Sequence, residues 1–229
     1  MVLAARDPDP EVRRHAFETL VTAYWKPVYK YLRLKWQAGA DEAADLTQAF
    51  FLNALEKRTL ESFDPAKARF RTFLRSCVDH FTANDRKAAR RLKRGGGHEP
   101  LSLDFVGAEG ELAGLDPPDP FDMEEYFHRE WIRTLFTLAV SDLQKRYAEL
   151  GKQGPWEAFR RYDLDAEEGD RPSYAALAAE LGVAVTQITN WLHTARRDLR
   201  ARVLARLRET TGTDEEFREE SRLLLGLRR

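Results

Sequence analysis

The chain has 229 residues, of which a third are charged, and its mean hydropathy is −0.57. No apolar run approaches the roughly 20 residues of a membrane span, and the opening MVLAARDPDP lacks a signal-peptide core. The single cysteine, Cys77, excludes an internal disulfide and a cysteine-based metal cluster. We therefore expect a soluble, cytoplasmic protein.

The charges are segregated, although the formal net charge is only −1. Residues 84–94 hold six cations and one acid, and residues 193–208 hold six arginines and one acid. Residues 104–125 hold eight acids and neither lysine nor arginine. Because local patches decide where a polyanion binds, the two basic stretches are candidate nucleic-acid contacts.

The first predicted helix starts at Asp9-Pro10, a pair typical of an N-cap followed by proline at the first helical position. Pro27 is expected to interrupt this helix, which continues as a second piece to about Gln37. Asp41 is expected to cap a third helix, EAADLTQAFFLNALEKR.

A connecting loop over residues 60–69 precedes a long helix expected over 70–94, which the glycines at 95–97 end. Its predicted core face consists of Phe73, Leu74, Cys77, Val78 and Phe81. No periodicity is present from 98 to 120, where glycine, proline and acids favour a flexible linker.

Helix resumes near Asp122 and is expected to run to about Leu150, before the short helix WEAFRRYDL. A helical pair follows at 173–208, and Asp214 is expected to cap a last helix. With no strand predicted, the fold class is all-α, with two helical domains. Their expected bounds are 1–94 and 122–229, and a flexible acidic linker spans 95–121.

The helical pair at 173–208 carries the most informative pattern. Ser173 has the chemistry of an N-cap, and Gly182 can take the left-handed conformation that ends a helix. The second helix restarts near Thr186, with one apolar face and an opposite face that is polar and then cationic. Such a face bonds base edges and phosphates when a helix-turn-helix enters the major groove. A solvated amphipathic helix is the alternative.

Aromatic rings lie near cations in the first region, a combination that binds single-stranded nucleic acid. Phe63 and Phe70 border a loop and are the better candidates for stacking. Phe73 and Phe81 lie on the apolar face and are better explained as core. Residues 50–55, FFLNAL, are apolar around much of the helix. They favour either a protein partner or burial within the bundle.

These parts, in this order, resemble an extracytoplasmic-function (ECF) sigma factor of bacterial RNA polymerase. ADLTQAFFLNALEK resembles the family's polymerase-binding helix, and FRTFLRSCVDHFTANDRKAARR is similar to its promoter-melting helix. YAALAAELGVAVTQITNWLHTARRDLR is similar to its −35-reading helix-turn-helix. The resemblance covers nearly the whole chain and implies a sigma region-2 bundle, a linker and a sigma region-4 domain.

The resemblance implies promoter-specific transcription initiation without catalysis or cofactor, and its partners are core RNA polymerase (β′ clamp and β flap) and promoter DNA. The implied polymerase-binding residues are Asp41, Asp45, Leu46, Gln48 and Phe51. The implied −10 residues are Phe63, Lys67, Arg69, Phe70, Arg71, His80, Asn84 and Arg86. The implied −35 residues are Thr186, Gln187, Asn190, His193, Arg196 and Arg197.

Two features depart from the family pattern. Ala49 stands where the family commonly has an acid, and phosphorylation of nearby Thr47 would restore a negative charge. The hypothesis is a switch set by a Ser/Thr protein kinase, as in a large kinase-linked subgroup; an ordinary solvent-facing threonine is the alternative. Residues 147–172 and 214–227 lengthen the second region and either bind a regulator or extend the domain.

A stand-alone helix-turn-helix regulator that never binds polymerase is the main rival hypothesis, because its DNA-binding half would look the same. An enzyme is disfavoured. The five histidines are scattered, and the chain has no HExxH, no CxxC and no glycine-rich phosphate loop. No metal site is expected.

Overall fold

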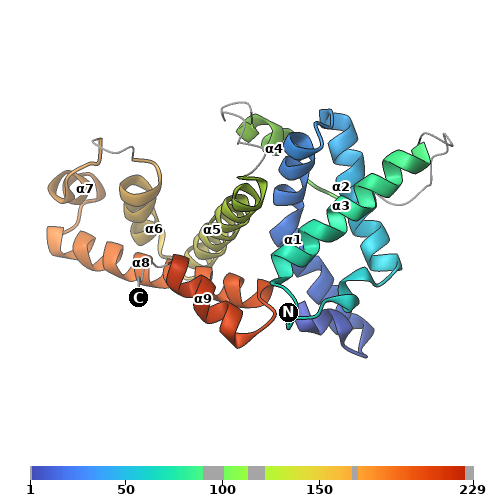
Figure 1. Ribbon diagram of the computed structural model, residues 1–229. Coiled ribbons are helices and arrows are strands. Elements are labelled where there is room, and N and C mark those ends of the chain that lie inside the picture. Colours follow the sequence, from blue (N-terminus) through green and yellow to red (C-terminus); the bar gives the residue numbers. More distant parts are fainter. Residues whose placement is uncertain (1, 90–100, 113–121, 167–169, 225–229) are drawn as a thin grey trace. The chain divides into compact units, whose positions relative to one another are not determined.

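The computed structural model describes residues 2–89, 101–112, 122–166 and 170–224 (Figure 1). Within these ranges it contains nine α-helices and no strand, which confirms the predicted all-α class. None of these helices is both long and apolar enough to cross a bilayer. The chain forms two compact units. The first comprises Met1–Thr134 with Leu207–Arg229, and the second comprises Leu135–Arg206.

In the first unit, helix α1 (Pro10–Lys35) begins as predicted, with the Asp9 carboxylate accepting a hydrogen bond from the Glu11 amide. The predicted interruption is wrong, because α1 continues through Pro27. Pro27 is buried in the bundle, and tertiary packing offsets the one backbone hydrogen bond that proline removes.

Helix α2 (Ala40–Glu56) follows a Gly39 N-cap that makes no side-chain hydrogen bond. The prediction that Asp41 caps this helix is therefore wrong by two residues. Asp41 lies in the first turn, where its charge still complements the positive end of the helix dipole. A 3₁₀ turn at Thr59–Ser62 then leads to α3 (Phe70–Ala89). The rest of the predicted helix, 90–94, lies outside the described residues.

The core of the first unit is aromatic. Tyr24 is fully buried, and its ring stacks on Trp131 with centroids 6.0 Å apart. Phe70 meets the same tyrosine edge-on at 5.5 Å. Trp131 belongs to α5 (Met123–Glu149), so the first turns of α5 belong with α1 and α3 in this unit.

Part of the predicted linker is helical. Residues Phe105–Leu112 form α4, and the Asp104 carboxylate accepts the Gly107 amide at its start. The acids of α4 meet cations of α1: Glu109 pairs with Arg33 at 2.5 Å. The expectation of a flexible linker is thus wrong for this segment. Its eight residues are too few to show a helical period, and the sequence does not reveal that their acids pair with α1. Residues 95–100 and 113–121 lie outside the described residues.

Helix α4 also helps to hold a buried lysine. Lys30 has no exposed surface, and its ammonium lies 2.6 Å from Glu111 and 2.5 Å from Glu130. Burying an unpaired charge is costly, so both carboxylates are required partners. Residues Phe105–Leu112 of the acidic stretch are therefore a folded part of the first unit.

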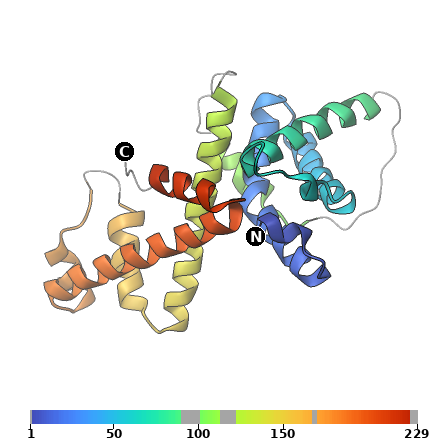
Figure 2. The same cartoon turned by 60° about the horizontal axis from the view of Figure 1, so that its bottom comes forward.

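The second unit contains the rest of α5, α6 (Gln153–Phe159), a π turn (Arg160–Leu164), α7 (Tyr174–Leu181) and most of α8 (Val185–Thr210). Its buried core includes Leu143, Phe159, Leu177, Ile188 and Leu192. In both views α6 and α7 lie along the same stretch of α8 (Figure 2).

The last helix, α9 (Asp214–Leu224), groups with the first unit, although the sequence placed it in the second region. Its start is capped by Thr213, whose hydroxyl accepts the Glu216 amide, rather than by the predicted Asp214. The buried residues Glu216 and Glu220 lie on its packed face.

Candidate nucleic-acid interface

Helices α7 and α8 are joined by a short turn, as predicted. The Ser173 hydroxyl accepts the Ala176 amide and caps α7. Gly182 ends α7 in the left-handed region at φ 65°, and the Val183 amide then donates to the Ala178 carbonyl. Helix α8 starts at Val185, next to Thr186, where the restart was predicted.

Helix α8 has one buried and one exposed face. Ile188, Leu192 and Ala195 have no exposed surface, because they pack on α6 and α7. The polar residues predicted to contact −35 DNA are all exposed: Thr186, Gln187, Asn190, His193, Arg196 and Arg197. We call these six residues the α8 polar face. Side chains that can bond base edges thus lie on one side of α8, and its other side packs on α6 and α7.

The two arginines of the α8 polar face differ in how they are held. Arg196 makes two hydrogen bonds to Asp163, at 2.8 and 2.9 Å, and lies over the Tyr162 ring. The bond to Asp163 is the main reason that the pKa of Arg196 is raised. Arg197 bonds to the neighbouring Asp198 and keeps 69% of its side chain exposed. Arg197 is therefore better placed than Arg196 to meet a phosphate.

The rings predicted to stack on single-stranded DNA are distributed differently from the expectation. Phe63 and Phe70 are both buried, with their rings edge-to-face at 5.2 Å. The preference for these two as stacking residues is corrected here, because neighbouring elements cover both. Phe73 and Phe81, expected in the core, are only partly buried.

The cations of the same cluster are already paired with acids of α9. Arg69 and Arg71 both contact Glu220, and Arg69 also contacts Glu219. Farther along α3, Arg86 bonds to Glu42 and to the Trp36 carbonyl. Lys67 is different, since it is 82% exposed and its partner Asp64 is 3.5 Å away.

His80 and Asn84 are exposed on α3 and line a hollow of about 380 Å³ between α2 and α3. Phe81 and Cys77 line the same hollow. Burial raises the pKa of the Cys77 thiol to about 11. The hollow combines an imidazole, an amide and a ring edge, which are groups that contact unstacked bases.

The residues predicted to bind polymerase separate into two sets on α2. Asp41 and Asp45 are exposed and Gln48 is partly exposed, so these three share an accessible stripe. Leu46 and Phe51 are buried. These two hold α2 in the bundle, and their assignment as contact residues is corrected accordingly.

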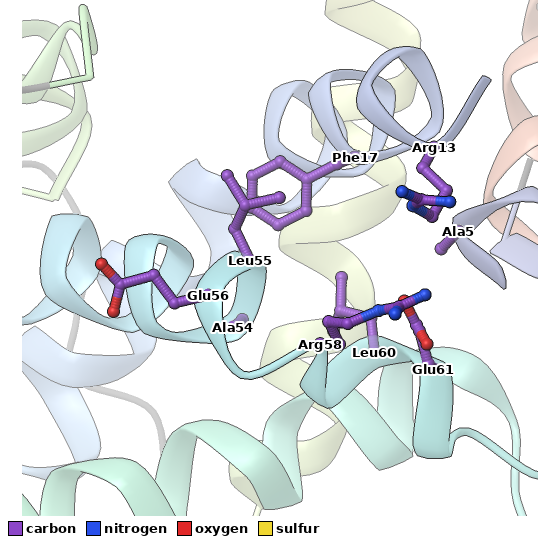
Figure 3. Close-up of a pocket in the computed structure, with 9 residues that line it drawn as sticks. All are labelled: Ala5, Arg13, Phe17, Ala54, Leu55, Glu56, Arg58, Leu60 and Glu61. Carbon is purple, nitrogen blue, oxygen red and sulfur yellow. The ribbon is translucent and has the colours of Figure 1, made fainter. Parts of the chain in front are cut away.

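Half of the apolar stretch FFLNAL is core, since Phe50, Phe51 and Ala54 are buried. Leu55 is half exposed and lines a second hollow of about 300 Å³ with Phe17 (Figure 3). The arginines at this hollow are engaged, Arg13 with the Asp7 carbonyl and Arg58 with Glu61.

Thr47 does not face solvent. It has no exposed surface, and its hydroxyl donates to the Ala43 carbonyl at 2.7 Å. Neither the predicted phosphorylation switch nor its solvent-facing alternative fits this position, because a kinase cannot reach a hydroxyl packed inside the bundle.

Sequence reasoning missed the acids that pair with the predicted cations. Glu219 and Glu220 lie some 150 residues away from Arg69 and Arg71 along the chain. The available signal was the acidic content of DEEFREES, with Glu216 and Glu220 four apart on one helical face. In the described ranges, no group of three or more histidine, cysteine or acidic side chains is placed to hold a metal ion.

Comparison of the chain with protein-family models, curated proteins and solved structures finds no match.

Proposed function

We propose that the protein is a sigma-type initiation factor that directs bacterial RNA polymerase to promoters. In this proposal the α8 polar face contacts −35 duplex, and the first unit contacts polymerase and the melted −10 strand. The proposal is supported by the order of the three sequence motifs and by the exposure of the α8 residues that they assign to DNA.

The observation that carries most weight is the α8 polar face. An N-capped helix, a left-handed glycine and a second helix with a buried apolar side form the scaffold. This scaffold leaves hydroxyl, amide, imidazole and guanidinium groups exposed on the other side of the helix. A helix with that exposed chemistry fits the major groove of B-DNA, where each base pair has a distinct donor and acceptor pattern.

The contact with core polymerase is proposed for the stripe of Asp41, Asp45 and Gln48 on α2. Exposed carboxylates near a helix N-terminus suit a basic surface on the β′ clamp. Leu46 and Phe51 position this stripe from the core side. The second unit would lie on the β flap, as the resemblance implies.

The −10 contact is proposed for the hollow beside His80 and Asn84 and for the exposed Lys67. Arg69, Arg71 and Arg86 belong to the same proposed surface, with their guanidinium groups held by acids in the free chain. No catalytic group is required, since nucleotide transfer belongs to the polymerase.

The decisive test is reconstitution of the purified chain with core RNA polymerase. We expect stoichiometric binding and run-off transcription from a selected promoter. Asp45→Asn should weaken polymerase binding by about threefold to tenfold, as for loss of one rim charge. Glu215→Gln removes one exposed carboxylate from α9 and serves as the matched control.

A chain that binds duplex DNA specifically but never core polymerase would contradict the proposal. That result would identify a stand-alone helix-turn-helix regulator. A chain that binds neither would leave the α8 polar face without its proposed ligand and would also contradict the proposal.

A further inference from the structure

Helix α9 lies against the residues that would hold the melted DNA strand. Glu220 has no exposed surface, and its Oε1 atom accepts from Arg69 at 2.8 Å and also from Arg71. Its Oε2 atom lies 3.2 Å from His128 Nε2. Glu219 accepts from the other terminal nitrogen of Arg69 at 2.7 Å. Two carboxylates of one helix thus occupy both arginines.

The segment that precedes α9 lies against the Phe63 ring of the same cluster. Gly212 lies so close to Phe63 that a Cβ atom there would stand 2.6 Å from the ring. Glu216 accepts hydrogen bonds from the Gly212 amide at 2.8 Å and from the Phe70 amide at 3.3 Å. The chain from Gly212 to Glu220 therefore contacts the Phe63 ring, the Phe70 backbone and the two arginines.

Carboxylates and phosphates compete for the same guanidinium donors. Both present oxygens that accept paired N–H groups, so an arginine bonded to a carboxylate cannot give the same donors to a phosphate. Arg71 is only 11% exposed in its side chain, which leaves no room for a second anion while α9 is in place.

We propose that α9 is an intramolecular acidic cover that competes with single-stranded DNA for the guanidinium groups of Arg69 and Arg71. A DNA strand can bind these two arginines only when α9 is released, and α9 cannot return while the strand is bound. The proposal rests on the function proposed above and adds a form of self-regulation to the strand-binding site.

The cover makes the apparent affinity depend on how often α9 is released. When only a fraction of molecules is open, the apparent dissociation constant equals the intrinsic constant divided by that fraction. Weakening the α9 contacts should therefore tighten binding, although no residue of the DNA surface has changed.

The test compares full-length variants by fluorescence anisotropy with a labelled single-stranded oligodeoxynucleotide. Glu220→Gln keeps the side-chain shape and should tighten binding by about tenfold, since the open fraction rises. Glu219→Gln, at a half-exposed position that tolerates the change, should tighten binding by about threefold. Glu215→Gln, on the same helix, should match the parent.

Hydrogen exchange tests the competition without any substitution. Adding saturating oligonucleotide to the parent protein should increase exchange at the amides of α9 and leave those of α7 unchanged. Loss of α9 protection on DNA binding supports the cover.

The remaining outcomes separate the two proposals. If all variants bind the oligonucleotide equally and α9 keeps its protection, the cover is refuted while strand binding stands. If neither the parent nor Glu220→Gln binds the oligonucleotide and Glu220→Gln remains folded by circular dichroism, the strand-binding surface and its cover are both refuted. Binding to core polymerase and to −35 duplex would still be tested separately.

Discussion

Thr47 shows how burial at a single position limits which side chains the fold tolerates there. Its hydroxyl is buried and bonded to the Ala43 carbonyl, so a negative charge at this site would have no partner. We predict that Thr47→Glu lowers the free energy of unfolding by about 3 kcal/mol or more, because an unpaired charge enters the core. Urea denaturation followed by circular dichroism measures this loss.

Ala49→Glu, two residues away on the exposed side of α2, provides the comparison. It should change the free energy of unfolding by less than about 0.5 kcal/mol, as surface substitutions usually do. It also restores the acid common in the resembled family, so polymerase binding should tighten. A Thr47→Glu protein as stable as Ala49→Glu would show that Thr47 can open to solvent.

Asn190 and Arg197 allow base contact and phosphate contact to be separated on α8. Arg197→Ala should weaken binding to all duplexes alike and reduce the slope of log K against log salt by about 0.9, the share of one phosphate. Asn190→Ala should weaken binding to the preferred duplex by about 1–3 kcal/mol and change binding to others little. Titrations of each variant in complex with core polymerase, on promoter and scrambled duplexes at several salt concentrations, distinguish the two patterns.

The types of the site residues could be predicted from the sequence, but not all of their exposures. Helical spacing placed Ile188 and Asn190 on opposite faces of one helix, and the structure confirms this. The same method failed for Phe63, because a loop residue has no helical phase and Gly212, far along the chain, covers its ring. Tertiary neighbours, not local pattern, determined which rings are accessible.

At the scale of elements, α4 is held by charge. Arg33 and then Tyr29 donate hydrogen bonds to Glu109, which lowers the pKa of this carboxyl from 4.5 to about 2. Because its pKa is lower in the folded chain, the ionised Glu109 carboxylate stabilises the fold at pH values above 4.5. This contribution is lost as the pH falls from 4.5 towards 2 and the carboxylate is protonated.

Glu109→Gln tests that contribution. The variant should lose about 1 kcal/mol of unfolding free energy at neutral pH, a value kept small because the pair is partly exposed to solvent. The difference from the parent should shrink as the pH is lowered to about 3. Glu215→Gln, without this pairing, should show no such trend, and a pH-independent difference for Glu109→Gln would contradict the linkage.

The turn between α7 and α8 depends on a residue that tolerates positive φ. Gly182 has φ 65°, and no atom lies within 4 Å of the place that a Cβ would take, so an alanine there would suffer backbone strain alone. Gly182→Ala should destabilise the protein by about 1 kcal/mol. Gly110→Ala, at an equally open position inside α4, should instead be neutral or stabilising. Thermal melts of both variants test the opposite signs.

Helix existence was predictable and helix continuity was less so. Asp9 and Ser173 indicated two helix starts correctly, because an N-cap side chain bonds an amide only two or three residues farther along the chain. Pro27 suggested a break that the packed bundle overrides, and α4 carries two glycines that hide its helical character. Helix α4 is held by cations of α1, and local periodicity cannot reveal a partner so far away along the chain.

At the scale of the whole molecule, cations and acids nearly cancel, with 37 lysines and arginines against 38 acids. Many of the cations in the described ranges are already paired, as Arg69 and Arg196 illustrate. We predict that the free chain binds duplex promoter DNA no tighter than about 1 μM at physiological salt, within the range of non-specific binding. Core polymerase should strengthen that binding greatly.

Anisotropy titrations of labelled duplex, with and without core polymerase, measure this difference. Tight, sequence-specific binding by the free chain would contradict the prediction and favour the stand-alone regulator. These titrations therefore test, by binding alone, whether the chain depends on core polymerase to recognise promoter DNA.

The lone thiol at Cys77 has a practical consequence for such work. Because its pKa is raised to about 11, the sulfur stays protonated near neutral pH and reacts slowly with maleimides and with air. A fluorescent dye for single-molecule spectroscopy could therefore be attached to Ala148→Cys, at an exposed position of α5. The native cysteine could stay in place unlabelled, so no substitution inside the bundle would be needed.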